Sequence, residues 1–152
     1  MKKTIFITGA AKRIGKEIAL CFSEMGWNII IHYNSSKNDA QVLADEINGN
    51  NPDSAITVQG NLDVKEDVEK VINEVRDAFP TIDLLINNAS TFYPTPIEDI
   101  SEEHWDKLVG SNLKGPLFLI KGLKDKLKES KGSIINITCL LYTSDAADEE
   151  AW

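Results

Sequence analysis

The sequence predicts an α/β fold in which a doubly wound parallel sheet carries helices on both faces. Apolar runs of strand length alternate along the chain with segments whose apolar residues recur at helical spacing, and the connections between them are short. The run 28–33 is almost wholly apolar, as in strands of parallel sheets that are buried on both sides. In such a sheet, ligands are expected at the carboxyl ends of the strands.

The first unit is the stretch 4–15, which reads T-I-F-I-T-G-A-A-K-R-I-G. We expect a buried strand, a tight turn of small residues and a helix, whose first N–H groups and positive dipole end form a seat for a phosphate. Gly9 permits the sharp turn, and Gly15 lets the helix lie close to the strand, as in glycine-rich dinucleotide loops. An ordinary strand-to-helix turn is the alternative reading of these glycines. Four apolar residues share one face of the helix: Ile14, Ile18, Phe22 and Met25.

The second unit begins with a strand over 28–33 and continues through a turn to a helix. Ser36 is placed to cap that helix, which is expected over 37–48. Its inward-facing residues are expected to be Ala40, Leu43, Ala44 and Ile47.

No acidic residue stands at the end of this second strand, where a site for NAD usually has an Asp or Glu on the ribose 2′-hydroxyl. Asn34, Ser35 and Lys37 stand there instead, and Lys12 and Arg13 are near in the expected fold. Hydroxyl, amide and cationic groups would accept a 2′-phosphate, which favours NADPH as the cofactor. Simple turn chemistry is the alternative explanation of the Asn-Ser-Ser sequence.

A third strand is expected over 55–59 and a fourth over 83–87. Asp63 is placed to cap the helix between them, with Glu66 at capping-box distance. The fourth strand is followed by an extended loop, 88–96, whose first residues are small enough for the backbone to pass close to a cofactor ribose. The apolar residues of the intervening helix are Val64, Val68, Val71, Ile72, Val75 and Phe79.

The last units are a long helix and a fifth strand. Ser101 is placed to cap the helix, which is expected to bend or break near Gly115 and Pro116. The fifth strand is expected over 133–137. The apolar residues of the long helix are Trp105, Leu108, Val109, Leu113, Leu117 and Ile120.

Length and charge limit the possible partners. A chain of 152 residues can form one domain with a proper core, and a net charge of −8 argues against nucleic acid and against an anionic membrane. No stretch approaches a membrane span or the apolar centre of a signal peptide, so a cytoplasmic location is expected. Cys21 and Cys139 lack metal-ligand spacing, so free thiols and no metal site are expected.

Two motifs, T-G-x-x-x-R-x-G at 8–15 and N-N-A-S at 87–90, resemble those of the short-chain dehydrogenase/reductase family, and within it the pteridine reductases. Further matches to that group are 32–33, 91–96 and 110–113. The resemblance implies a Rossmann-type sheet with the strand order 3-2-1-4-5, truncated after the fifth strand. The same resemblance implies an NADPH-dependent reductase that transfers hydride to a C=N or C=O carbon of a small molecule, such as a pterin. It also implies a homo-oligomer, dimer or tetramer, for the full-length protein.

By position, the resemblance implies that Arg13 and Ser90 contact cofactor and substrate together and that Phe92 stacks on a flat pterin ring. A loop aromatic packed into the core is the alternative for Phe92. Around the cofactor, the 2′-phosphate would lie among 33–35 and the adenine beside Asn61. The cofactor-binding residues expected in full are Gly9, Lys12, Arg13, Ile14, Gly15, Tyr33, Asn34, Ser35, Asn61, Leu62, Asn88, Ala89 and Ser90.

The family's chemistry uses a tyrosine hydroxyl as proton donor and a lysine four residues later, on the same helix face. The one Tyr-x-x-x-Lys in the sequence is Tyr33 with Lys37, which begins in a strand and ends in a helix, so we interpret it as a chance match. Asn112 matches the family asparagine that supports the catalytic lysine through a water. With the sheet ending after the fifth strand, the chain is expected to bind NADPH weakly and to turn over nothing.

The likeness to the family runs from about residue 3 to residue 138, so 1–138 is predicted to be an incomplete NADP-binding domain. The segment 139–152 matches nothing expected, and its back-translation resembles a transposon-end sequencing adapter, which leads to the hypothesis that it is translated adapter. A 3-oxoacyl carrier-protein reductase is a rival within the family. A sensor that binds NADP(H) without catalysis is a rival of another class.

Overall fold

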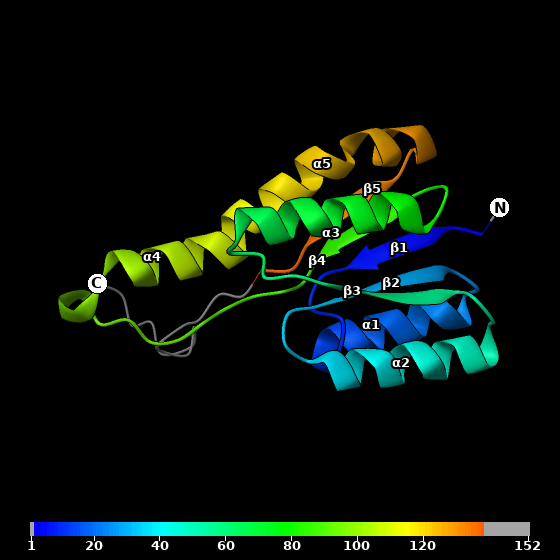
Figure 1. Cartoon of the computed structure of the whole chain (residues 1–152), viewed down its shortest axis with the longest axis horizontal. Coiled ribbons are helices and arrows are strands. Elements are labelled where there is room, and N and C mark those ends of the chain that lie inside the picture. The colour runs from blue at the N-terminus through cyan, green and yellow to red at the C-terminus, as the bar shows by residue number, and fades with distance from the viewer. Residues whose placement is uncertain (1, 139–152) are drawn as a thin grey trace, which may run out of the picture.

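The computed structural model describes residues 2–138, which form a five-stranded sheet in the order β3-β2-β1-β4-β5 (Figure 1). Every neighbouring pair of strands is parallel. The predicted α/β class, parallel sheet and strand order are therefore confirmed. The strands are β1 (Thr4–Ile7), β2 (Asn28–Tyr33), β3 (Ala55–Gln59), β4 (Leu84–Asn87) and β5 (Ser133–Asn136).

The helical elements of this part of the chain are α1 (Arg13–Glu24), α2 (Lys37–Asn50), α3 (Lys65–Ala78), the 3₁₀ turn η1 (Ile97–Asp99), α4 (Glu102–Val109), the π-helical segment η2 (Gly110–Lys114) and α5 (Gly115–Ser130). Figure 1 shows α1 and α2 on one face of the sheet and α3 and α5 on the other, while α4 extends beyond the sheet. Helices on both faces agree with the prediction.

Alternate residues of β1 belong to two separate cores. Ile5 and Ile7 pack with residues of α1 and α2, whereas Phe6 packs with residues of α3 and α5. All four residues of β1 are buried. Burial on both sides explains why the central strands are continuous apolar runs and do not alternate between apolar and polar residues.

The register of the sheet brings the carboxyl ends of β1, β2 and β4 to one edge. Ile7 pairs with β2 on one side and with Ile86 of β4 on the other. Just beyond β1, the N–H of Thr8 donates to the C=O of Ile86 at 3.0 Å, and the N–H of Ala10 donates to the C=O of His32 at 2.9 Å. The turns that follow these three strands therefore lie at the same edge.

The face of α1 that meets the sheet is made of small residues. Its buried residues are Gly15, Ala19 and Ser23. Ile14 and Met25, at the ends of the predicted apolar face, are 61% and 62% exposed, while Ile18 and Phe22 are partly buried against the core. The apolar spacing correctly indicated a helix but not its orientation, because contact with the sheet is close enough to require small side chains.

Gly15 is the point of closest contact between α1 and the loops around it. A Cβ at this position would overlap the C=O oxygen of Gly9 and would lie 2.7 Å from Nδ2 of Asn88 and 2.8 Å from Cα of Ala10. These neighbours are mainly backbone atoms, which cannot move aside as a flexible side chain can. The predicted role of Gly15 in close helix–strand contact is consistent with this geometry.

The predicted helix caps have different outcomes. The Ser101 hydroxyl accepts a hydrogen bond from the N–H of His104 at 3.2 Å, as expected of an N-cap. Ser36 occupies the N-cap position of α2, but its side chain makes no capping bond, and α2 continues to residue 50. The expectation that Asp63 caps α3 is wrong, because Val64 takes the N-cap position without a side-chain bond.

The predicted break in the long helix is present as η2, which separates α4 from α5 just before Gly115 and Pro116. Two glycines bring this segment against the turn after β3. A Cβ at Gly110 would lie 3.2 Å from Cα of Asp63, and one at Gly115 would lie 2.8 Å from the C=O oxygen of Leu62. The π-helical segment therefore packs closely on a turn at the site edge of the sheet.

Apolar residues are exposed along α4, η2 and α5 and along β5. Trp105, Leu113 and Leu117 are 65%, 64% and 58% exposed, and all residues of β5 are exposed. Within residues 2–138, β5 pairs with β4 alone, so its other side is an open sheet edge, as expected. No helix in this part of the chain is both long and apolar enough to cross a membrane. The hypothesis about 139–152 concerns a segment outside the described residues.

Replacement of Gly15 by alanine tests the close contact. Gly15→Ala is expected to lower the free energy of unfolding by about 1–3 kcal/mol, because the added methyl group overlaps backbone atoms. A Cβ added at Gly49, within α2, would point into open space, so Gly49→Ala is the matched control and should raise stability by about 0.5–1 kcal/mol. Urea unfolding of both variants measures the difference, and equal effects would contradict the proposed contact.

Candidate functional site

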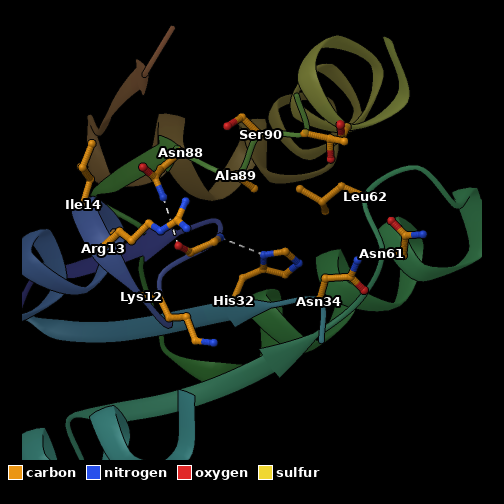
Figure 2. Close-up of a pocket in the computed structure, with 14 residues that line it drawn as sticks. Lys12, Arg13, Ile14, His32, Asn34, Asn61, Leu62, Asn88, Ala89 and Ser90 are labelled. Carbon is orange, nitrogen blue, oxygen red and sulfur yellow. Dashed lines mark hydrogen bonds between the residues drawn. The ribbon is translucent and has the colours of Figure 1, made fainter. Parts of the chain in front are cut away.

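A cleft of about 450 Å³ lies at the carboxyl ends of the strands, where the turns after β1, β2, β3 and β4 meet (Figure 2). Every cofactor-binding residue expected from the sequence lines this cleft, except Tyr33 and Ser35. Three further residues, His32, Thr91 and Ser111, were not in that set. The cleft is lined by Gly9, Lys12, Arg13, Ile14, Gly15, His32, Asn34, Asn61, Leu62, Asn88, Ala89, Ser90, Thr91 and Ser111.

The turn after β1 forms one wall of the cleft and has unusual backbone angles. Gly9 has a φ of 61°, in the left-handed region that glycine adopts readily, and a Cβ there would lie 3.0 Å from Cα of Ala89. Arg13, the first residue of α1, has a φ of 52°, which is uncommon for a residue with a side chain. The Arg13 side chain lines the cleft (Figure 2).

Hydrogen bonds join this turn to the loop after β4. The Thr8 hydroxyl oxygen accepts from the N–H groups of Asn88 and Ala89, each at 2.9 Å. The Asn88 side-chain amide donates to the C=O of Thr8 at 3.0 Å and to the C=O of Gly9 at 3.1 Å. Asn88 thus fixes two walls of the cleft to each other. Thr8, which makes half of this network, was not among the candidate site residues.

His32 joins the same turn to the loop after β3. Its Nδ1 accepts from the N–H of Gly9 at 3.1 Å (Figure 2). Its Nε2 donates to the C=O of Gly60 at 3.0 Å. Burial lowers the pKa of His32 to about 4, and the hydrogen bond to Gly60 opposes this shift only in part. The imidazole is therefore neutral near pH 7. From the sequence, His32 was included among the matches at 32–33 but had no expected role in the site, although a histidine inside an apolar strand was the available signal.

An acidic residue partly compensates the positive charge of Lys12 in the cleft lining. Nζ of Lys12 lies 3.0 Å from a carboxylate oxygen of Asp39, and both side chains are about half exposed. Asn34 lines the cleft, as expected. Tyr33, in contrast, is buried in the core on the side of α1 and α2, and Ser35 is exposed outside the cleft lining. Of the three residues expected to surround the 2′-phosphate, the structure therefore brings only Asn34 to the cleft.

Of the residues expected to contact substrate, some line the cleft and others do not. Arg13 and Ser90 both line the cleft. Phe92 is 66% exposed and does not line it, and this exposure also excludes the alternative that Phe92 packs into the core. The Asn112 side chain bonds to the backbone of Thr91, accepting from its N–H at 2.9 Å and donating to its C=O at 2.8 Å. Asn112 thus holds the loop that forms the cleft rim.

The chance-match interpretation of Tyr33 and Lys37 agrees with their surroundings. Tyr33 ends β2 and is buried, whereas Lys37 is the exposed first residue of α2. A proton donor and its lysine partner need to share one helix face beside the substrate. These two residues lie on different elements, and neither lines the cleft.

A family model described as short chain dehydrogenase matches residues 3–146. The 3-oxoacyl-[acyl-carrier-protein] reductase FabG of Staphylococcus epidermidis is 32% identical over 142 residues, which are 93% of this chain and 58% of that protein. The NAD-dependent glycerol dehydrogenase of Listeria innocua is 34% identical over 136 residues, which are 89% of this chain and 52% of that protein. The chain spans about half the length of the curated relatives it matches.

Solved structures give the same fold. The crystal structure of FolM Alternative dihydrofolate reductase 1 from Brucella suis in complex with NADP superposes with a TM-score of 0.80 at 30% sequence identity. The match covers 88% of this chain and 55% of that chain. The corresponding protein from Brucella canis, also complexed with NADP, matches equally well.

The pKa of His32 predicts how stability depends on pH. Between pH 6.5 and about 4 the unfolded chain binds a proton at this residue and the folded chain does not, so the stability from this group is complete above 6.5 and falls with pH below it. The loss should be about 2 kcal/mol between pH 7 and pH 5. Urea unfolding of the wild type and of His32→Asn at both pH values isolates this contribution, and parallel pH profiles would contradict it.

Proposed function

This chain belongs to the short chain dehydrogenase family, and from that premise we propose that its cleft binds a nicotinamide dinucleotide, NADP(H), for hydride transfer. The observation that carries the proposal is the convergence of the turns after β1, β2, β3 and β4 on one cleft of about 450 Å³. Its lining contains the glycine turn, two cationic side chains and several hydrogen-bonding side chains. A parallel sheet binds such cofactors at this edge.

The residues of the turn after β1 suit a pyrophosphate. Gly9 and Gly15 have no side chain, and the small side chains of Ala10 and Ala11 are buried, so none of these four residues places a bulky group between the backbone and a ligand. The first turn of α1 contains no acidic residue that would repel an anion. Its free N–H groups and the helix dipole favour negative charge at this point.

Three side chains of the cleft lining, those of Lys12, Arg13 and Asn34, favour the binding of a 2′-phosphate. Lys12 and Arg13 line the cleft, and the residue that lines it after β2 is Asn34, with no acid to bind a free ribose 2′-hydroxyl. The ion pair of Lys12 with Asp39 reduces this preference, since part of the charge is already compensated. Two relatives differ here, because one is described as NAD-dependent and the other was solved with NADP.

The substrate that we propose for the complete protein is a pterin or another small compound with a C=N or C=O bond, to which bound reduced nicotinamide would supply hydride. Arg13 and Ser90 line the cleft and would orient such a substrate by hydrogen bonds. Asn112 would keep the rim loop in place through Thr91. Phe92 would stack on the substrate only after its exposed side chain turned toward the cleft. Oligomer formation by the complete protein belongs to the same proposal.

Two other functions remain as candidates. A 3-oxoacyl carrier-protein reductase is favoured by relatives of that description at 32% identity. A sensor that binds NADP(H) without catalysis is favoured by the lack, within residues 2–138, of a Tyr-x-x-x-Lys pair that lines the cleft. Dihydropterin and oxoacyl substrates offered to a completed gene separate the two reductases. The codons that follow residue 138 at the source locus separate an enzyme from a sensor.

Substitutions in the ion pair of Lys12 with Asp39 test the preference for NADPH over NADH. Lys12→Gln should weaken NADPH binding about fivefold to tenfold and leave NADH binding unchanged, because only NADPH carries the 2′-phosphate. Asp39→Asn should strengthen NADPH binding about twofold to fivefold by freeing Lys12. Lys70→Gln, which breaks an exposed pair with Glu74 on α3, is the control. Fluorescence titration measures all four proteins, and equal losses for both cofactors would exclude a 2′-phosphate contact.

The chain itself is expected to show no turnover. We propose that 1–138 is the dinucleotide-binding part and that 139–152 is translated adapter, so the proton-donating tyrosine and its lysine are not in this chain. NADPH absorbance should therefore stay constant when the purified chain is mixed with dihydropterin or oxoacyl substrates. Oxidation of NADPH above the blank would contradict the proposal, as would a source gene that encodes 139–152 and then stops.

A further inference from the structure

We propose that His32 is a positioning residue for the dinucleotide, and that it acts by holding the N–H of Gly9 with its Nδ1 atom. This inference rests on the proposed function, because it concerns the same cleft. His32 belongs to β2, is 1% exposed and lies behind the glycine turn. It reaches the turn at Gly9 on one side and the loop after β3 at Gly60 on the other.

The Gly9 peptide groups are held from two directions. The C=O of Gly9 accepts from the Asn88 side chain at 3.1 Å, and its N–H donates to Nδ1 of His32 at 3.1 Å. The next N–H, that of Ala10, donates to the C=O of His32 at 2.9 Å. Because the φ of Gly9 is 61°, this turn has conformational freedom that only glycine has, and the bonds to His32 and Asn88 restrict it.

The orientation of the imidazole ring follows from its two partners. Gly9 offers an N–H, so Nδ1 must be the acceptor, and Gly60 offers a C=O, so Nε2 must carry the proton. The low pKa of His32 agrees with this neutral form. A hydrogen on Nδ1 would face the N–H of Gly9, so only one of the three protonation forms of the ring fits the turn.

The bond to Gly60 extends the effect to a second wall of the cleft. Gly60 follows β3, and its N–H donates to the C=O of Tyr33 at 3.1 Å. The next residues, Asn61 and Leu62, line the cleft. One buried side chain therefore sets the distance between the turn that would hold the pyrophosphate and the loop that would hold the adenine.

The two bonds of His32 can be separated by substitution. In His32→Asn the amide oxygen can replace Nδ1 and accept from Gly9, while the bond to Gly60 is lost. In His32→Gln the longer amide can replace Nε2 and donate to Gly60, while the bond to Gly9 is lost. Each variant removes one hydrogen bond of similar strength from the same buried position, so each is the matched control of the other.

The two variants should differ in binding more than in stability. His32→Asn is expected to bind NADPH within about twofold of the wild type, and His32→Gln about fivefold to tenfold more weakly, in fluorescence titration at pH 7. Thermal unfolding of the same samples should show similar decreases for both. A purely structural histidine would weaken binding in proportion to stability, and that result would overturn the inference.

A measurement on the unaltered chain keeps the inference testable if a variant does not fold. With ¹⁵N-labelled histidine, NMR should show His32 protonated at Nε2 and unprotonated at Nδ1, and the Gly9 amide should exchange slowly with solvent. A proton on Nδ1, or fast exchange at Gly9, would overturn the inference. If the wild type binds neither NADPH nor NADH, the proposed function and this inference both fail. If the wild type binds and His32→Gln binds equally well, only this inference fails.

Discussion

The site depends on close contact between backbone atoms at the start of α1. Gly15 lies against the carbonyl oxygen of Gly9, and Gly9 in turn lies against Ala89. A single methyl group at either glycine would separate α1 from the turn or the turn from the loop after β4. Because neighbouring parallel strands end at one edge, the absence of side chains at these two positions lets α1, the turn after β1 and the loop after β4 meet at one side of the cleft.

Hydrogen bonds from polar side chains then hold the turn after β1 in the position that the glycines make possible. Thr8 and Asn88 tie the turn to the loop after β4, and His32, a residue of β2, ties it to Gly60 after β3, so the turn is held from both sides. The charged side chains of the cleft lining are Lys12 and Arg13, and Asp39 compensates part of their charge through its ion pair with Lys12. Buried neutral hydrogen bonds therefore determine the shape, and exposed ions affect the choice of ligand.

The strand order and most of the cleft lining could be predicted from the resemblance of sequence motifs to a known family, and the parallel sheet with both helix layers could be predicted from local patterns that repeat along the chain. The apolar run in β2 and the glycine turn are examples, since neighbouring residues alone identify them. Other features depend on contacts between distant segments. These are the exposure of the Ile14 side chain, the burial of Tyr33 in the core and the ion pair of Lys12 with Asp39. Patterns within one segment carry no information about such contacts.

The open side of β5 has a consequence for any solution study of this chain. Within residues 2–138 nothing pairs with that side of β5, so its backbone N–H and C=O groups are available to water or to a strand from another molecule. Ile134 and Ile135 are 41% and 47% exposed beside them. Self-association through this strand would increase with protein concentration. Ligand affinities measured at one concentration would then combine two equilibria, which a dilution series separates.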